Sequence, residues 1–312
     1  MNYLPKSGLN TQLPSLPSGP GLAIDYMRVR GPAQIRLQER FGREMTNLLA
    51  APKDSTGTVV RIGMASNAGP RSRNEDSAVA VMFHVGGQAT PMPLILAAVA
   101  DGVSGDVDAG LASAIAIYEL IDFVIGYFTA NQPGSMRLNI PSVEDLLLKA
   151  CSAGHNAIKA QTFGGSTTLT GALIINRAAY IAHVGDSRAY LLNTEWKDME
   201  LITHDHRRTR EWQDFNIATN EHLKTHPDGH VLYRALGIGD ECSIDMTRRN
   251  LVDGSRLLLC TNGLWESVRS AQLYSVVHLS NNPQDSCERL VSLALANGTH
   301  DDMTAVLVEM PD

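Results

Sequence analysis

The sequence is poor in cysteine and has no excess of positive charge, and both deficits exclude classes of protein. Only four of its 312 residues are cysteine, and no two of them form a Cys-x-x-Cys pair. Neither a zinc knuckle nor a disulfide framework is therefore expected. Lysine and arginine (26) are outnumbered by aspartate and glutamate (33), which gives a net charge of −7. This balance argues against a nucleic-acid partner that is bound through its phosphates.

The sequence also shows no targeting segment. We find no apolar run of membrane-spanning length, and the first residues lack the charged start and apolar block of a secretory signal. An apolar fraction of 44% and a charged fraction of 19% are typical of a globular protein with a buried core. We expect a cytoplasmic protein without a membrane span; export by a route that leaves no such signal stays open.

The chain divides into an N-terminal extension, residues 1–57, and a main domain, residues 58–312. Residues 1–22 are rich in proline, serine and glycine, which is typical of a flexible arm. Residues 33–50 have apolar side chains at helical spacing. This amphipathic helix is expected to dock on the main domain, with recruitment of a partner as the alternative.

The main domain is predicted to be an α+β sandwich, because helices occur in pairs between groups of strands. The expected strands, from apolar and β-branched runs, cover residues 58–64, 77–85, 93–99, 169–176, 179–183, 189–192, 257–261 and 304–309. The expected helices cover residues 111–128, 143–161, 271–279 and 283–296.

Acidic residues lie at the ends of several predicted strands. Asp101-Gly102 directly follows one apolar strand, and Asn262-Gly263 follows another. Glu75 and Asp76 precede a strand, and Asp301 lies just before the last one. A side chain at a strand end is held rigidly and still reaches solvent, so these groups could converge on one place.

Converging carboxylates repel one another unless a cation neutralises them. Hard oxygen ligands suit Mg²⁺ or Mn²⁺ better than zinc. Two such ions can activate a water molecule and stabilise both the attacking and the leaving oxygen of a phosphoryl transfer. Arg71 is close enough in sequence to Asp76 to bind the phosphate there. Any one Asp-Gly pair alone would more often be a tight turn, so the hypothesis depends on the whole set.

A series of short motifs contains these acidic residues and extends along the chain: GPRSRNED at 69–76, ADGVSG at 100–105, GSTT at 165–168, VGDSRAY at 184–190, LITHDH at 201–206, HP at 226–227, RALG at 234–237, CTNGLWE at 260–266 and DDMT at 301–304. In content and order, this series resembles the PP2C (metal-dependent, PPM) family of protein phosphatases in its bacterial form. The resemblance implies a four-layer α-β-β-α sandwich with two central, mostly antiparallel sheets. It also implies hydrolysis of phosphoserine and phosphothreonine in a phosphoprotein substrate, opposite a serine/threonine kinase.

The resemblance further implies a role for each matched residue. Asp101 would bridge two Mn²⁺ or Mg²⁺ ions, and the Gly102 carbonyl, Glu75 and Asp76 would support one of them. Asp301 and position 262 would hold the other ion, and Asp186 would bind an additional, weaker third ion. Arg71 would bind the substrate phosphate, and residues 207–230 would correspond to a flap that shapes access.

One departure from the family pattern concerns activity. Position 262 is aspartate in active members and Asn262 here. A neutral amide oxygen still coordinates a metal ion but more weakly. The chain is therefore either a working phosphatase with a raised metal demand or a pseudophosphatase that binds phosphoproteins; an intentionally inactivated variant would look the same.

Overall fold

The computed structural model describes residues 22–41, 60–85, 92–103, 105, 108–130, 140–193, 199–210 and 231–311. Its strands are β1 (Leu22–Arg30), β2 (Arg61–Asn67), β3 (Asp76–Val85), β4 (Met92–Asp101), β5 (Leu169–Ile175), β6 (Ala178–Val184), β7 (Arg188–Leu192), β8 (Glu200–Leu201), β9 (Asp245–Asn250), β10 (Arg256–Cys260) and β11 (Met303–Glu309). Its helices are α1 (Ala33–Phe41), α2 (Ala109–Ala130), α3 (Ile140–Gln161), α6 (Asn262–Trp265), α7 (Ser270–Leu279) and α8 (Pro283–Ala296).

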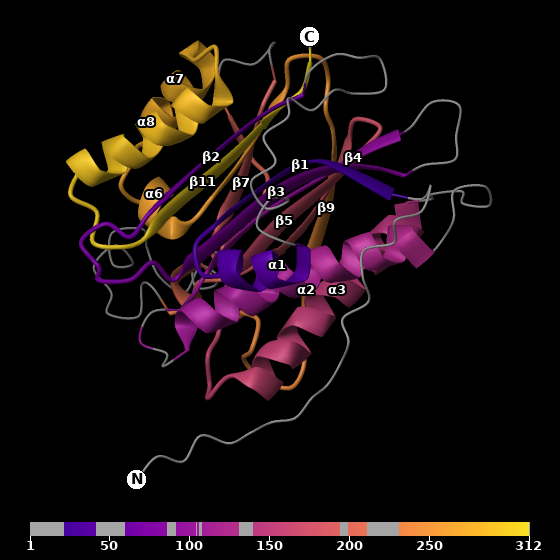
Figure 1. The fold of residues 1–312 in the computed structure, drawn as a ribbon. Helices are drawn as coiled ribbons and strands as arrows, with labels where there is room; N and C mark the ends of the chain where they lie inside the picture. Colours follow the sequence, from indigo (N-terminus) through magenta and orange to yellow (C-terminus); the bar gives the residue numbers. More distant parts are fainter. Residues whose placement is uncertain are drawn as a thin grey trace.

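Two antiparallel sheets form the centre of the molecule. The first sheet has the strand order β1-β3-β4-β5-β6-β9, and the second has the order β2-β11-β10-β7-β8. In Figure 1, α1, α2 and α3 lie on the outer side of the first sheet, and α6, α7 and α8 lie on the outer side of the second. The predicted four-layer α-β-β-α sandwich is confirmed.

Three apolar clusters hold these layers together. One joins the first sheet to α1, α2 and α3, and includes Leu96 and Ile117. A second fills the space between the two sheets, and a third joins the second sheet to α6, α7 and α8. Because both faces of β5 and β11 are covered, every residue of these strands is buried.

Helix α2 corrects one expectation from the sequence. It is long and apolar enough to cross a membrane by length and composition, whereas no such run was expected. Twelve of its 22 residues are buried, and ten of these pack within the cluster that joins the helices to the first sheet. Its apolar character is therefore accounted for by its place between α1, α3 and the sheet.

The described part of the N-terminal extension is built into the sandwich. β1 pairs with β3 from Leu22↔Val85 to Arg30↔Ala78, and so forms an edge of the first sheet. Helix α1, the described part of the amphipathic helix predicted at 33–50, packs against α2. β1 and α1, which precede the predicted boundary at residue 58, thus pack on the main domain. Residues 1–21 of the predicted arm (1–22) and residues 42–50 of the predicted helix (33–50) lie outside the described residues.

Candidate active site

Strand pairing brings two predicted site residues face to face. Asp76, the first residue of β3, is paired with Asp101, the last residue of β4. Both are buried, with exposed fractions of 0% and 5%. Like charges opposite each other on neighbouring strands are destabilising, so this pair calls for a proton or a cation.

The pKa values of these two carboxyl groups reflect their burial and their mutual repulsion. Burial raises the pKa of Asp101 well above its usual range, and the charges of Asp76, Asp186 and Asp301 raise it further. Burial also raises the pKa of Asp76, although hydrogen bonds from Thr304 and Thr261 oppose the shift. Both hydroxyls donate to Asp76 Oδ2, at 2.7 and 2.8 Å, while Oδ1 has no partner. A divalent cation would satisfy that oxygen and remove the repulsion.

The loop before β11 adds a second pair of acidic residues. Asp301 Oδ1 lies 2.8 Å from Nη1 of Arg71, so these two predicted residues form an ion pair. Asp302 accepts a hydrogen bond of 2.8 Å from the backbone N–H of Glu75, and its side chain is fully buried. Burial raises the pKa of Asp302 to about 6, against the opposing effects of the Glu75 hydrogen bond and of Arg71.

Asp302 is a site residue that we did not predict. It ties the loop before β11 to Glu75, and its Oδ1 is buried without a partner. The signal in the sequence is the run of two aspartates at 301–302 directly before a strand. We assigned a role only to the first of them.

Asn262 is the first residue of α6, which begins two residues after the end of β10. The close approach of α6 to the 301–302 loop requires glycine at position 263, because a Cβ there would lie 2.0 Å from the Asp302 carbonyl oxygen. Asn262 Oδ1 is buried and has no hydrogen-bond partner. This oxygen is therefore available to a ligand.

Asp186 lies at the turn between β6 and β7 and is paired with an arginine. Arg207 Nε donates to Asp186 Oδ2 at 2.6 Å, and Arg207 Nη2 lies 2.5 Å from Oε1 of Glu266. Burial alone would lower the pKa of Arg207, but the two carboxylates raise it. Trp265 lies beside this group and donates from Nε1 to the Asp186 carbonyl at 3.0 Å.

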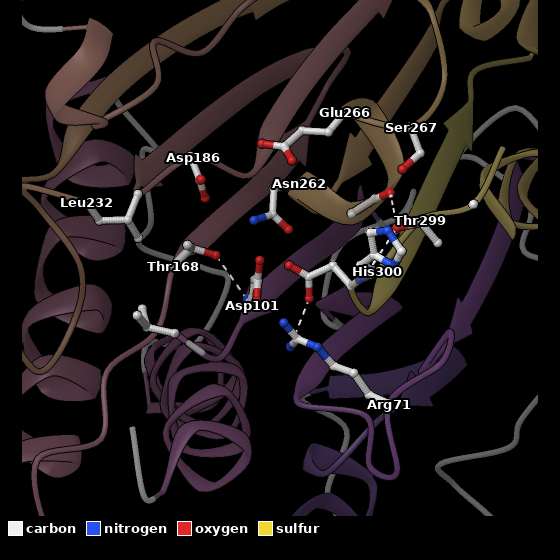
Figure 2. Close-up of a pocket in the computed structure, with 14 residues that line it drawn as sticks. Arg71, Asp101, Thr168, Asp186, Leu232, Asn262, Glu266, Ser267, Thr299 and His300 are labelled. Atoms are coloured by element: carbon white, nitrogen blue, oxygen red, sulfur yellow. Dashed lines mark hydrogen bonds and ion pairs between the residues drawn. The ribbon is translucent and has the colours of Figure 1, made fainter. Parts of the chain in front are cut away.

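Several of these residues line one cavity of about 580 Å³. Its lining includes five of the predicted residues: Arg71, Asp101, Asp186, Asn262 and Asp301. Figure 2 shows Asp101, Asn262 and Asp186 grouped around its centre, with Arg71 reaching in from the opposite side.

The three other predicted residues lie beside the cavity. Asp76 is buried next to Asp101, and the Gly102 N–H donates to the Glu75 carbonyl at 3.3 Å. The Glu75 side chain is about one-third exposed and lies 3.6 Å from Arg71. Of the predicted flap, only residues 207–210 are described.

The fit of this site to metal ions rests on its unpartnered oxygens. Asp76 Oδ1, Asp186 Oδ1, Asn262 Oδ1 and Asp302 Oδ1 are all buried without a hydrogen bond, which is the donor type that Mg²⁺ and Mn²⁺ prefer. Within the described ranges, no three His, Cys, Asp or Glu side chains already converge on one point as ligands. Two features explain this: Asp301 is paired with Arg71, and position 262 is an asparagine rather than a carboxylate. The oxygen donors of the site fit such ions if the Arg71–Asp301 ion pair opens.

Comparison with known proteins gives a consistent picture. Residues 218–311 match the family model described as stage II sporulation protein E (SpoIIE). The chain is 32% identical over 266 residues to the serine/threonine protein phosphatase PstP of Mycobacterium tuberculosis, covering 81% of this chain and 46% of that protein. It is 27% identical over 223 residues to the serine/threonine phosphatase stp of Listeria innocua, covering 70% of this chain and 84% of that protein. The chain thus spans about half the length of the mycobacterial relative.

Solved structures agree with these similarities. The crystal structure of the M. tuberculosis phosphatase PstP/Ppp matches with a TM-score of 0.66 at 29% identity, covering 81% of this chain and 99% of that one. The catalytic domain of PstP in complex with two manganese ions matches with a TM-score of 0.64, at the same identity and coverage.

Proposed function

Because the chain belongs to the PPM (PP2C-type) family of bacterial serine/threonine phosphatases, we propose that it hydrolyses phosphoserine and phosphothreonine in proteins with bound Mn²⁺ or Mg²⁺. The observation that carries the proposal is the cavity between the strand ends, where Asp101, Asn262 and Asp301 face Arg71. The phosphoprotein would be the substrate of an opposing serine/threonine kinase, and the reaction would take place in the cytoplasm.

Each residue of the cavity has a task in this proposal. Asp101 and Asp76 would hold one ion, with Glu75 and the Gly102 carbonyl beside it, and Asp301 and Asn262 would hold the other. When bound, two such ions supply an activated water molecule and neutralise the charge on the phosphate. Arg71 would turn from Asp301 to the phosphate, whose oxygens match its planar guanidinium group.

Two of the acidic residues are already held in position before a metal ion binds. Asp76 and Asp101 are held by strand pairing, and Asp76 also by Thr261 and Thr304, so these two ligands would need little rearrangement when metal binds. Preorganisation of this kind lowers the cost of reaching the reactive arrangement.

A second candidate function follows from Asn262. A neutral amide at a metal position weakens binding of the second ion, so the chain could bind phosphoproteins without turnover. We regard this pseudophosphatase as the alternative, because Arg71, Asp101 and Asp301 all lie in the cavity and are the groups that hydrolysis requires.

Hydrolysis of a phosphothreonine peptide across a Mn²⁺ titration separates the two candidates. We expect both the wild-type chain and Asn262→Asp to turn over, with the variant reaching half-maximal activity at a lower Mn²⁺ concentration. Activity in Asn262→Asp alone would favour the pseudophosphatase. Activity in neither protein would contradict phosphatase function itself.

A further inference from the structure

The turn between β1 and α1 lies directly against the backbone that carries Asp76. Gly31 in this turn has a φ of +75°, and a Cβ built on it would lie 1.8 Å from the Asp76 carbonyl oxygen. No side chain can occupy that space, so this backbone contact requires glycine. The N-terminal segment thus touches a predicted metal ligand from outside the cavity.

A chain of buried hydrogen bonds reaches the neighbouring ligand from the same segment. The N–H of Ala33 lies 3.2 Å from Ser77 Oγ and donates to it, and Ser77 Oγ lies 3.0 Å from Ser113 Oγ. Ser113 Oγ in turn lies 2.6 Å from the carbonyl oxygen of Glu75 and donates to it. Both serine side chains are fully buried. The start of α1 is therefore linked through α2 to the backbone of Glu75.

Strand pairing provides the third contact. The β1–β3 ladder extends to Arg30↔Ala78, two residues from Asp76. Without β1, β3 would be the edge of the first sheet, where strands fray most readily. Position 76 also lies opposite Asp101, so movement of this strand end would separate the two carboxylates.

We propose that residues 30–33 form a positioning element of the active site, which fixes the backbone at 75–77 for metal binding. The element belongs to the N-terminal extension and reaches the site through backbone contacts with residues that we assign as ligands. This inference rests on the proposed function, because it concerns affinity for the same metal ions. Metal affinity would then depend on a segment that does not line the cavity.

Two glycine substitutions test this proposal against a matched control. Gly31→Ala introduces the Cβ that would overlap Asp76. Gly164→Ala carries a similar backbone penalty, because Gly164 has a φ of +83°, but a Cβ there would meet nothing within 4 Å. Ser77→Ala is a milder second variant that removes the acceptor of the Ala33 N–H and leaves Gly31 in place. Mn²⁺ binding to each full-length protein is measured by titration calorimetry below its Tm.

We expect Gly31→Ala to weaken Mn²⁺ binding by about tenfold or more, the usual effect of losing support behind a metal ligand. Ser77→Ala should shift the affinity in the same direction, and Gly164→Ala should stay within about twofold of wild type. A merely structural contact would lower Tm and leave the Mn²⁺ affinity of the folded protein unchanged.

The proposal is overturned if the folded Gly31→Ala protein binds Mn²⁺ as wild type does. If Gly31→Ala does not fold, an unchanged affinity in Ser77→Ala overturns it. A wild-type chain that binds no Mn²⁺ would instead refute the proposed function, and this inference with it, before any variant is compared.

Discussion

At the scale of single residues, Arg71 has two alternative partners. In the described structure its guanidinium group pairs with Asp301, whereas in the proposed reaction it binds the substrate phosphate. In the proposed reaction, metal binding at Asp301 and phosphate binding at Arg71 would therefore be linked, because both would require the same ion pair to open.

Replacing Arg71 by alanine should separate these two effects. We expect kcat/KM for a phosphothreonine peptide to fall about 10–150-fold, which corresponds to the loss of a charge-assisted hydrogen bond. The Mn²⁺ affinity should stay the same or rise, since Asp301 loses a competing cation. Steady-state kinetics and calorimetry measure the two quantities. The exposed neighbour Arg73 provides the control, and a loss of Mn²⁺ binding in Arg71→Ala would contradict the account.

Arg207 gives a second prediction at this scale. Its guanidinium group lies between Asp186 and Glu266, so it already neutralises the residue predicted to hold a third, weaker ion. A divalent ion would compete with Arg207 for Asp186. We expect Arg207→Met to bind one Mn²⁺ more per chain than wild type when both are measured by equilibrium dialysis at the same free Mn²⁺.

Arg188 offers a matched control for that experiment. The Arg188 and Arg207 guanidinium groups both lie beside the Trp265 ring, and that of Arg188 is 3.4 Å from the ring centre. Arg188, however, pairs with Asp205 rather than with Asp186. Arg188→Met should leave the number of bound ions unchanged. An equal count in wild type and Arg207→Met would show that Arg207 and a metal ion do not compete for Asp186.

At the scale of elements, the apolar pattern predicted most of the buried strands and helices and missed β9 and β1, the two edge strands of the first sheet. The predicted strand at 93–99 and helix at 283–296 correspond closely to β4 and α8. We did not predict β9, because its sequence DMTRRN lacks an apolar run. β9 is an edge strand that is held by backbone pairing with β6, and its side-chain pattern does not indicate this pairing.

β1 was missed for a related reason. Its position lies between a proline-rich arm and an amphipathic helix, and its partner β3 is about 50 residues away in the sequence. Its conformation is stabilised by pairing with β3 and by burial of Met27 and Val29 in the core. Non-local contacts of this kind are not encoded in local spacing.

Two identical substitutions in different elements should have opposite effects on stability. Gly126 lies in α2, and a Cβ there would meet nothing within 4 Å, so Gly126→Ala should raise the free energy of unfolding by about 0.5–1 kcal/mol. Gly63 lies in β2, where a Cβ would lie 2.1 Å from the Pro283 carbonyl at the start of α8. Gly63→Ala should therefore destabilise the packing of β2 on α8. Urea denaturation measures both changes, and a shift of the same sign in the two variants would contradict this account.

At the scale of the whole molecule, the sequence motifs named residues that the structure places around one cavity, and the structure adds the contacts that hold them there. Five of the predicted residues line one cavity, although they come from strand ends and loops as far apart as Arg71 and Asp301. The ion pairs of Arg71 and Arg207 were not predictable, because each depends on the distance between two loops that no local pattern fixes. The part played by Asp302 was missed for the same reason.

The stability of the whole fold should depend on pH through a histidine outside the cavity. His183 on β6 is buried, and its Nδ1 and Nε2 lie 2.9 Å from Thr170 Oγ1 and 3.0 Å from the His204 carbonyl. Burial and the nearby His206 together lower the pKa of His183 to about 4, although the His204 carbonyl, Asp205 and Asp245 oppose the shift.

The direction of this effect follows from proton binding. Between pH 6.5 and about 4 the unfolded chain protonates this histidine and the folded chain does not, so stability falls as the pH falls. From this group alone, the free energy of unfolding should drop by about 2 kcal/mol between pH 7 and pH 5. Urea denaturation of wild type and His183→Gln at both pH values measures the drop, which should be smaller in the variant whatever its absolute stability. The exposed His278 serves as the control, because His278→Gln should keep the wild-type dependence. Equal drops in wild type and His183→Gln would mean that His183 is protonated in the folded protein and that its burial does not exclude the charge.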